Sequence, residues 1–216
     1  MYNITLVSSF HIEIGKCNSD ELYKIIEKIQ PELIFEELPC DLFEIIYADE
    51  YNPESLEAKA IKKYLKNYQI EHIPVDTLEI SETDLFNGYD TISNKSIEYT
   101  KVFKLQLSMI SQYGYSFLNS NDFNELLDKM HIIEENVLIE INDTKLLYQY
   151  KSYCELNDKR EIDMLQNIYN YSRQHQYNKA LFICGVEHRK SIMQKILEYE
   201  KKKKLPLNWT FYSNQN

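Results

Sequence analysis

The stretch KALFICGVEH (residues 179–188) decides the fold class. An apolar run ends at a glycine, and a histidine follows three residues later. The stretch NITLVSSFH (residues 3–11) has the same shape, with an apolar run, two serines, a phenylalanine and a histidine. Short apolar runs of this kind are typical of strands buried on both faces of a parallel sheet. Each stretch therefore predicts a buried strand with a histidine, His11 or His188, just past its end.

The segments between these two stretches alternate between helical and strand patterns. Residues 17–31 carry apolar side chains at helical spacing, with Asn18 or Ser19 as the N-cap and Pro31 as the stop. Alternating patterns of this kind indicate βαβ units. We therefore predict an α/β fold with a mostly parallel sheet of about four to six strands flanked by helices. Strands are predicted at 3–8, 32–39, 70–76, 179–185 and, at an edge, 208–213; helices at 17–31, 55–67, 159–176 and 188–204.

Residues 80–145 break this alternation. Residues 96–118 carry a wide apolar stripe at helical spacing, and residues 120–130 begin a second helix behind Ser120 or Asn121. We interpret 80–145 as a helical insertion within a single domain that spans residues 1–216.

Composition excludes several classes of partner. The chain of 216 residues has a formal net charge of −10, which disfavours nucleic acid; the basic run Lys201–Lys204 suits a helix C-terminus. No stretch approaches the roughly 18 apolar residues of a membrane span. Four cysteines without CxxC spacing indicate free thiols in a reducing compartment. We expect a cytoplasmic protein that acts on a small molecule or a peptide, and its oligomeric state stays open.

Polar residues follow four predicted strands in succession. These residues are His11, the pair Glu36 and Glu37, Asp76, and His188. Because parallel strands end at one edge of the sheet, where ligands bind, these side chains are expected to meet there.

Arg160 is expected at the same edge. The helix from Arg160 to about Gln176, with Ile162, Leu165 and Ile168 on one side, covers roughly 24 Å at 1.5 Å per residue. The strand that follows returns roughly 17–20 Å in the opposite direction. Arg160 therefore begins close to the point where the fourth strand ends.

Two kinds of chemistry are open to such a group. Two neutral imidazoles and a carboxylate can hold a divalent metal such as Zn, Mn or Co, whose bound water then ionises near neutral pH. Alternatively, one histidine serves as a general base oriented by a carboxylate. In either case Arg160 would hold an oxyanion or a substrate carboxylate.

The motifs resemble those of the TraB/Tiki superfamily, which includes erythromycin-esterase-like and ChaN-like proteins. Gly185 and His188 match its second GxxH motif, GVEH at 185–188. The stretch QPELIFEELP resembles a proline, strand and EL pattern that selects Glu37 over Glu36, NDKREIDML supplies Arg160, and IPVD supplies Asp76. The resemblance covers roughly residues 3–76 and 155–197. The first motif differs from the pattern, since SSFH carries Ser8 in place of the glycine, and Glu187 is charged where a small residue is expected.

The resemblance implies a metal-dependent, peptidase-like hydrolase in the Tiki branch. His11, Glu37 and His188 would then be the metal ligands and catalytic residues together with Arg160, while Asp76 would orient a histidine and Gly185 would shape the cofactor site. The erythromycin-esterase-like branch implies metal-independent hydrolysis by a histidine, and the ChaN-like branch implies haem binding. The altered first motif adds a further alternative, a non-catalytic interaction protein.

Overall fold

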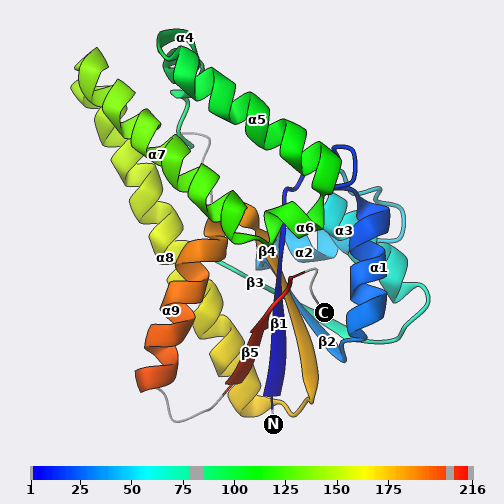
Figure 1. Cartoon of the computed structure of the whole chain (residues 1–216). Helices are drawn as coiled ribbons and strands as arrows, with labels where there is room; N and C mark the ends of the chain where they lie inside the picture. The colour runs from blue at the N-terminus through cyan, green and yellow to red at the C-terminus, as the bar shows by residue number, and fades with distance from the viewer. Residues whose placement is uncertain (1, 78–84, 203–206, 214–216) are drawn as a thin grey trace.

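The computed structural model describes residues 2–77, 85–202 and 207–213. These residues form a five-stranded parallel sheet with helices on both faces, which confirms the predicted α/β class (Figure 1). The strand order is β3-β2-β4-β1-β5. The strands are β1 (Tyr2–Ser9), β2 (Leu33–Pro39), β3 (Glu71–Asp76), β4 (Lys179–Gly185) and β5 (Leu207–Phe211).

The two strands that precede the histidines are direct neighbours at the centre of the sheet. β1 pairs with β4 in parallel, and the register places Ser9 opposite Gly185. The segments that carry His11 and His188 therefore leave the sheet side by side, although 177 positions separate the two residues in sequence.

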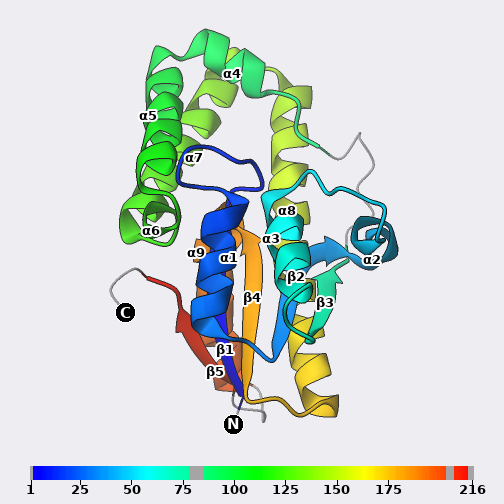
Figure 2. The same cartoon turned by 90° about the vertical axis from the view of Figure 1, so that its right-hand side faces the viewer.

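Each face of the sheet has its own helical layer. Helices α1 (Ser19–Ile29) and α3 (Leu56–Leu65) cover one face, and α8 (Thr144–Gln174) with α9 (Arg189–Lys202) cover the other (Figures 1 and 2). Side chains alternate between the two layers with the period of two that a strand imposes. Leu181 and Ile183 pack with α1 and α3, whereas Phe182 packs with α8 and α9.

The insertion is helical, as predicted, in the part that the structure describes; residues 80–84 lie outside it. With the first half of α8 it extends beyond the carboxyl edge of the sheet (Figure 1). Its helices are α4 (Tyr89–Lys95), α5 (Ile97–Tyr113), α6 (Tyr115–Leu118) and α7 (Asn121–Ile141). A separate apolar cluster that includes Phe86, Ile92 and Leu138 holds α4, α5 and α7 together with the first half of α8, whereas α6 packs in the cluster that also contains α1 and α3.

Two helices differ from the sequence-based prediction. Helix α8 begins at Thr144, not near Lys159, so Arg160 lies in the middle of the helix. Ile162 is 37 % exposed, whereas Glu161, Leu165 and Ile168 are buried. Glu161, Leu165 and Ile168 are spaced i, i+4 and i+7, which follows one helix face. Three-residue steps, as from Ile162 to Leu165 and Ile168, drift away from that face. Helix α2 (Cys40–Tyr47) was not predicted, although Leu42, Ile45 and Ile46 stand at helical spacing in it; none of its residues is buried.

None of the described helices has both the length and the apolar character needed to cross a bilayer. Helix α9 ends at Lys202, so the predicted helix end carries the start of the basic run, while Lys203 and Lys204 lie outside the described residues.

Asn119 joins the insertion to strand β1. Its side-chain oxygen accepts a hydrogen bond from the Ser8 backbone N–H at 2.9 Å, and its side-chain nitrogen donates to the Ser8 carbonyl at 3.0 Å. The guanidinium of buried Arg189 also donates to the Asn119 side chain, at 2.9 Å. The serine in the first histidine motif is therefore held by its backbone.

Replacing Asn119 by alanine is expected to lower the free energy of unfolding by about 3 kcal/mol, because it leaves the Ser8 N–H without an acceptor and removes one of the acceptors of the buried Arg189 guanidinium. Urea unfolding followed by circular dichroism measures this loss. Asn94→Ala, at an exposed position of α4, is the matched control and should change the stability little. Equal losses in both variants would contradict the assigned role.

Candidate functional site

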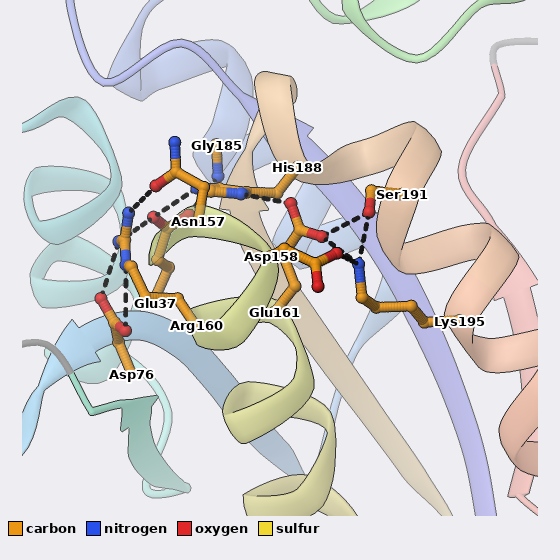
Figure 3. Close-up of polar contacts among 10 residues, drawn as sticks. All are labelled: Glu37, Asp76, Asn157, Asp158, Arg160, Glu161, Gly185, His188, Ser191 and Lys195. Atoms are coloured by element: carbon orange, nitrogen blue, oxygen red, sulfur yellow. Dashed lines mark hydrogen bonds and ion pairs between the residues drawn. The ribbon is translucent and has the colours of Figure 1, made fainter. Parts of the chain in front are cut away.

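A row of charged side chains crosses the carboxyl edge of the sheet (Figure 3). At its centre, Arg160 of α8 donates to Asp76 at the end of β3, with distances of 3.3 Å from Nε and 2.8 Å from Nη2. Nη2 also donates to Glu37 of β2 at 2.8 Å, and Nη1 donates to Asn157 at 3.0 Å. The structure therefore brings Glu37, Asp76 and Arg160 together. Asp76 was expected to orient a histidine, but it contacts Arg160.

Glu37 is the glutamate that faces the row. Its Oε2 accepts the Gly185 backbone N–H at 2.6 Å, and its Oε1 lies 3.2 Å from His188 Nε2. Its neighbour Glu36 points to the other side of β2, where it contacts His72 at 3.1 Å and accepts the Tyr47 hydroxyl at 2.6 Å. Strand alternation thus separates the two glutamates. Burial raises the pKa of Glu37, but the charges of His188, His11 and Arg160 outweigh burial and lower it to about 2.

His188 lies between two carboxylates. Its Nε2 faces Glu37, and its Nδ1 lies 2.8 Å from Glu161 Oε1. Burial lowers the pKa of His188, but Glu37 and Glu161 outweigh burial and raise it to about 10. The ring is therefore an imidazolium at neutral pH, with both nitrogens occupied, and not the neutral imidazole that a helix N-terminus would favour.

Glu161 continues the row on the far side of His188. Its Oε2 accepts hydrogen bonds from the Ser191 hydroxyl and, at 2.7 Å, from Lys195 Nζ. Lys195 also pairs with Asp158 at 2.5 Å (Figure 3). The charges of the row thus alternate in sign from buried Asp76 to exposed Asp158, and each buried ion of the row has a partner of opposite charge, as buried ions require.

His11 lies beside this row and has a carboxylate of its own. Its Nδ1 is 3.1 Å from Oε1 of Glu57, which also accepts the His11 backbone N–H at 3.0 Å. The His11 side chain is 51 % exposed, whereas that of Glu57 is 11 % exposed. Its backbone has a φ of 60°, a left-handed conformation that is rare outside glycine and common at functional sites. Burial lowers the pKa of His11, but the hydrogen bond and charge of Glu57 outweigh it and raise the pKa to about 9.

Gly185 allows the two groups to approach each other. A Cβ atom at this position would lie 2.5 Å from His11 Nε2 and 3.3 Å from Glu37 Oε2. The imidazole and the carboxylate therefore meet over the glycine of the second motif. This contact confirms the expectation that the segments carrying His11 and Gly185 converge at one edge.

The exposed side of His11 faces a cavity of about 180 Å³. Its wall combines the polar groups of His11, Glu37 and Glu57 with apolar side chains of β2, α2, α3 and β4. A second cavity, of about 260 Å³, lies on the other side of His188 and is lined by the insertion, α8 and the start of α9.

Glu57, Asn157 and Glu161 are site residues that the sequence analysis missed. Glu57 follows the N-cap Ser55, where an acidic residue is ordinary, so its position gave no signal. Glu161 did leave a signal, since it falls on the same helix face as Leu165 and Ile168, where an apolar residue is expected. A polar residue on a core-facing stripe could therefore have been selected from the sequence.

The arrangement does not fit a metal ion held by His11, Glu37 and His188. Both ring nitrogens of His188 face carboxylates, and both oxygens of Glu37 already accept hydrogen bonds. A metal ligand must be a deprotonated nitrogen or an available oxygen. Within the described residues, no three His, Cys, Asp or Glu side chains form a group suited to a metal ion.

Comparison with protein-family models, with curated proteins and with solved structures gives no match to this chain.

The pKa of His188 predicts a pH dependence of stability. A histidine whose pKa is raised in the folded state stabilises it fully below its ordinary pKa of 6.5, and this contribution is lost as the pH rises through about 10. We expect the free energy of unfolding to fall from neutral pH towards pH 10, and to fall less in His188→Gln. Urea titrations over this range measure both slopes. His175→Gln, at an exposed histidine, should keep the wild-type slope; a wild-type slope in His188→Gln would refute the assignment.

Proposed function

We propose that this chain is a metal-independent hydrolase of small carboxylic esters in which His11 transfers the proton. The observation that carries the proposal is the pair of His11 and buried Glu57 at the edge of the sheet where α/β proteins bind ligands. One ring nitrogen is held by the carboxylate, and the other is directed towards Gly185 and Glu37. Kinship with the erythromycin-esterase-like branch of the TraB/Tiki superfamily is part of this proposal and rests on the motif resemblance.

The reaction requires one proton to move twice. Neutral His11 accepts a proton at Nε2 from water, and the resulting hydroxide attacks the ester carbonyl carbon. When the bond to the leaving oxygen breaks, the imidazolium of His11 returns that proton to the alcohol. Glu57 holds Nδ1–H, which fixes the ring orientation and stabilises the imidazolium.

The charged row places positive groups close to the proposed reaction site. Attack on the carbonyl places negative charge on its oxygen, and preorganised positive groups stabilise such charge in a dry site. His188 and Arg160 are the buried cations nearest to Glu37. All three nitrogens of Arg160 donate to protein groups, so we assign it to positioning Glu37, not to substrate binding.

The cavity beside His11 suits a small acyl group. Apolar side chains of Leu38, Ile46, Ala58 and Ile183 form part of its wall. Its volume of about 180 Å³ is below the roughly 300–1,000 Å³ of pockets for drug-sized ligands. This size favours a short acyl chain, and neither cavity is large enough to favour the haem alternative.

His11→Gln should lower kcat/KM for 4-nitrophenyl acetate by about 100-fold or more, since it removes the proton acceptor. In the wild type the rate should rise with pH up to about 9, because only the neutral ring accepts a proton. In Glu57→Gln the midpoint should move to lower pH, because the carboxylate that raises the pKa of His11 is gone. His175→Gln is the control. Wild-type rates in His11→Gln, or an unmoved midpoint in Glu57→Gln, would reject the proposal.

A metal-independent mechanism is distinguished from the metal-dependent alternative by elemental analysis. Elemental analysis of the purified protein should show no stoichiometric Zn, Mn or Co, and dialysis against a chelator should leave ester hydrolysis intact. A stoichiometric metal whose removal abolishes hydrolysis, and whose return restores it, would replace the proton-transfer mechanism with the metal-dependent one.

A further inference from the structure

The cavity between the insertion and α8 has a wall with an unmatched negative charge. It lies on the side of His188 away from Glu37 and has a volume of about 260 Å³. Its lining includes the carboxyl groups of Glu134, Asp158, Glu161 and Glu187. Asp158 and Glu161 are paired with Lys195, and Glu161 also with His188. The other two carboxyl groups of the wall, those of Glu134 and Glu187, are not paired with a cation in the part of the chain that the structure describes.

These two glutamates have no cationic partner among the described residues. Glu187 makes no ion pair or hydrogen bond within the part of the chain that the structure describes. Glu134, which is 3 % exposed, accepts hydrogen bonds from two uncharged groups, the Tyr150 hydroxyl at 2.9 Å and the Tyr99 hydroxyl. Lys190, the other nearby lysine, pairs with Asp128. Burial lowers the pKa of His131, so this lining residue contributes a neutral ring at neutral pH.

Aromatic rings complete the wall. Tyr89, Tyr150 and Tyr153 line the cavity, and Phe86 packs edge-on against two of them, with ring centroids 5.0 Å from Tyr89 and 5.1 Å from Tyr150. A cavity with tyrosine rings and unbalanced carboxylates attracts a cation that carries apolar substituents, because the rings contact the substituents while the carboxylates meet the charge.

We propose that this cavity binds a small organic ammonium ion, with Glu134 and Glu187 as its counter-charges. The proposal explains why Glu187 stands inside the GVEH motif, where a small residue was expected. It also explains why a buried carboxyl group is kept on α7: burial, with a further contribution from Glu187, raises the pKa of Glu134 to about 7, and a bound cation would restore its charge. The inference goes beyond the proposed ester hydrolysis and does not depend on it.

Isothermal titration calorimetry with choline chloride at low salt tests the proposal without turnover. Choline should bind with one-to-one stoichiometry, and its uncharged carbon analogue 3,3-dimethylbutan-1-ol should bind at least about tenfold more weakly, a difference of about 1.4 kcal/mol. This comparison isolates the charge, because the two probes have nearly the same shape. Equal affinity for the two probes, or no choline binding at millimolar concentration, would overturn the proposal.

Variants assign the counter-charges. Glu187→Gln, at an exposed position that tolerates the change, and Glu134→Gln, which resembles the neutral form of the buried acid, should each weaken choline binding about tenfold. Glu140→Gln, at an exposed position near the end of α7, is the matched control. Unchanged binding in both Glu187→Gln and Glu134→Gln, or an equal loss in Glu140→Gln, would place the ligand elsewhere and refute the site.

Discussion

The carboxylate of Glu37 is the interaction on which the rest of the site depends. One side chain from β2 accepts hydrogen bonds from the β4 backbone at Gly185 and from Arg160 of α8, and it contacts His188 beyond β4. It therefore joins the sheet to the helix that covers it and to the start of the next helix. Breaking a buried pair of this kind costs about 3–5 kcal/mol, because the partner charge remains buried. The ion pairs of Glu37, in addition to packing, therefore fix the geometry around it.

The sheet topology explains why these charges meet. β4 lies between β1 and β2, so the two strands that precede the histidines and the strand that carries Glu37 are adjacent. Their parallel direction brings three strand ends to one edge, and β3 adds Asp76 from the next position. Helix α8 crosses this edge in its middle, which places Arg160 and Glu161 on opposite sides of His188. The charged row is therefore a consequence of strand order and of the length of one helix.

Helix α8 also links the two halves of the molecule. Its second half covers the sheet, while its first half packs with α4, α5 and α7 beyond the edge. Both cavities touch the charged row, one at Glu37 and the other at His188 and Glu161. The row thus separates a small cavity beside the His11 and Glu57 pair from an acidic, aromatic cavity formed largely by the insertion.

The periodic features of this protein can be read from its sequence. Apolar runs marked the strands, and the two helix caps were each narrowed to a pair of residues, of which the structure uses Asn18 and Ser120. The motif resemblance selected Glu37, Arg160, Gly185 and His188 as neighbours. Tertiary structure alone decided the partners: Asp76 with Arg160, Glu57 with His11, and Glu161 with His188. The physical reason is that periodicity reports only which face of an element is buried. Which charges meet, and therefore which protons are held, depends on strand order and on contacts between residues far apart in the chain.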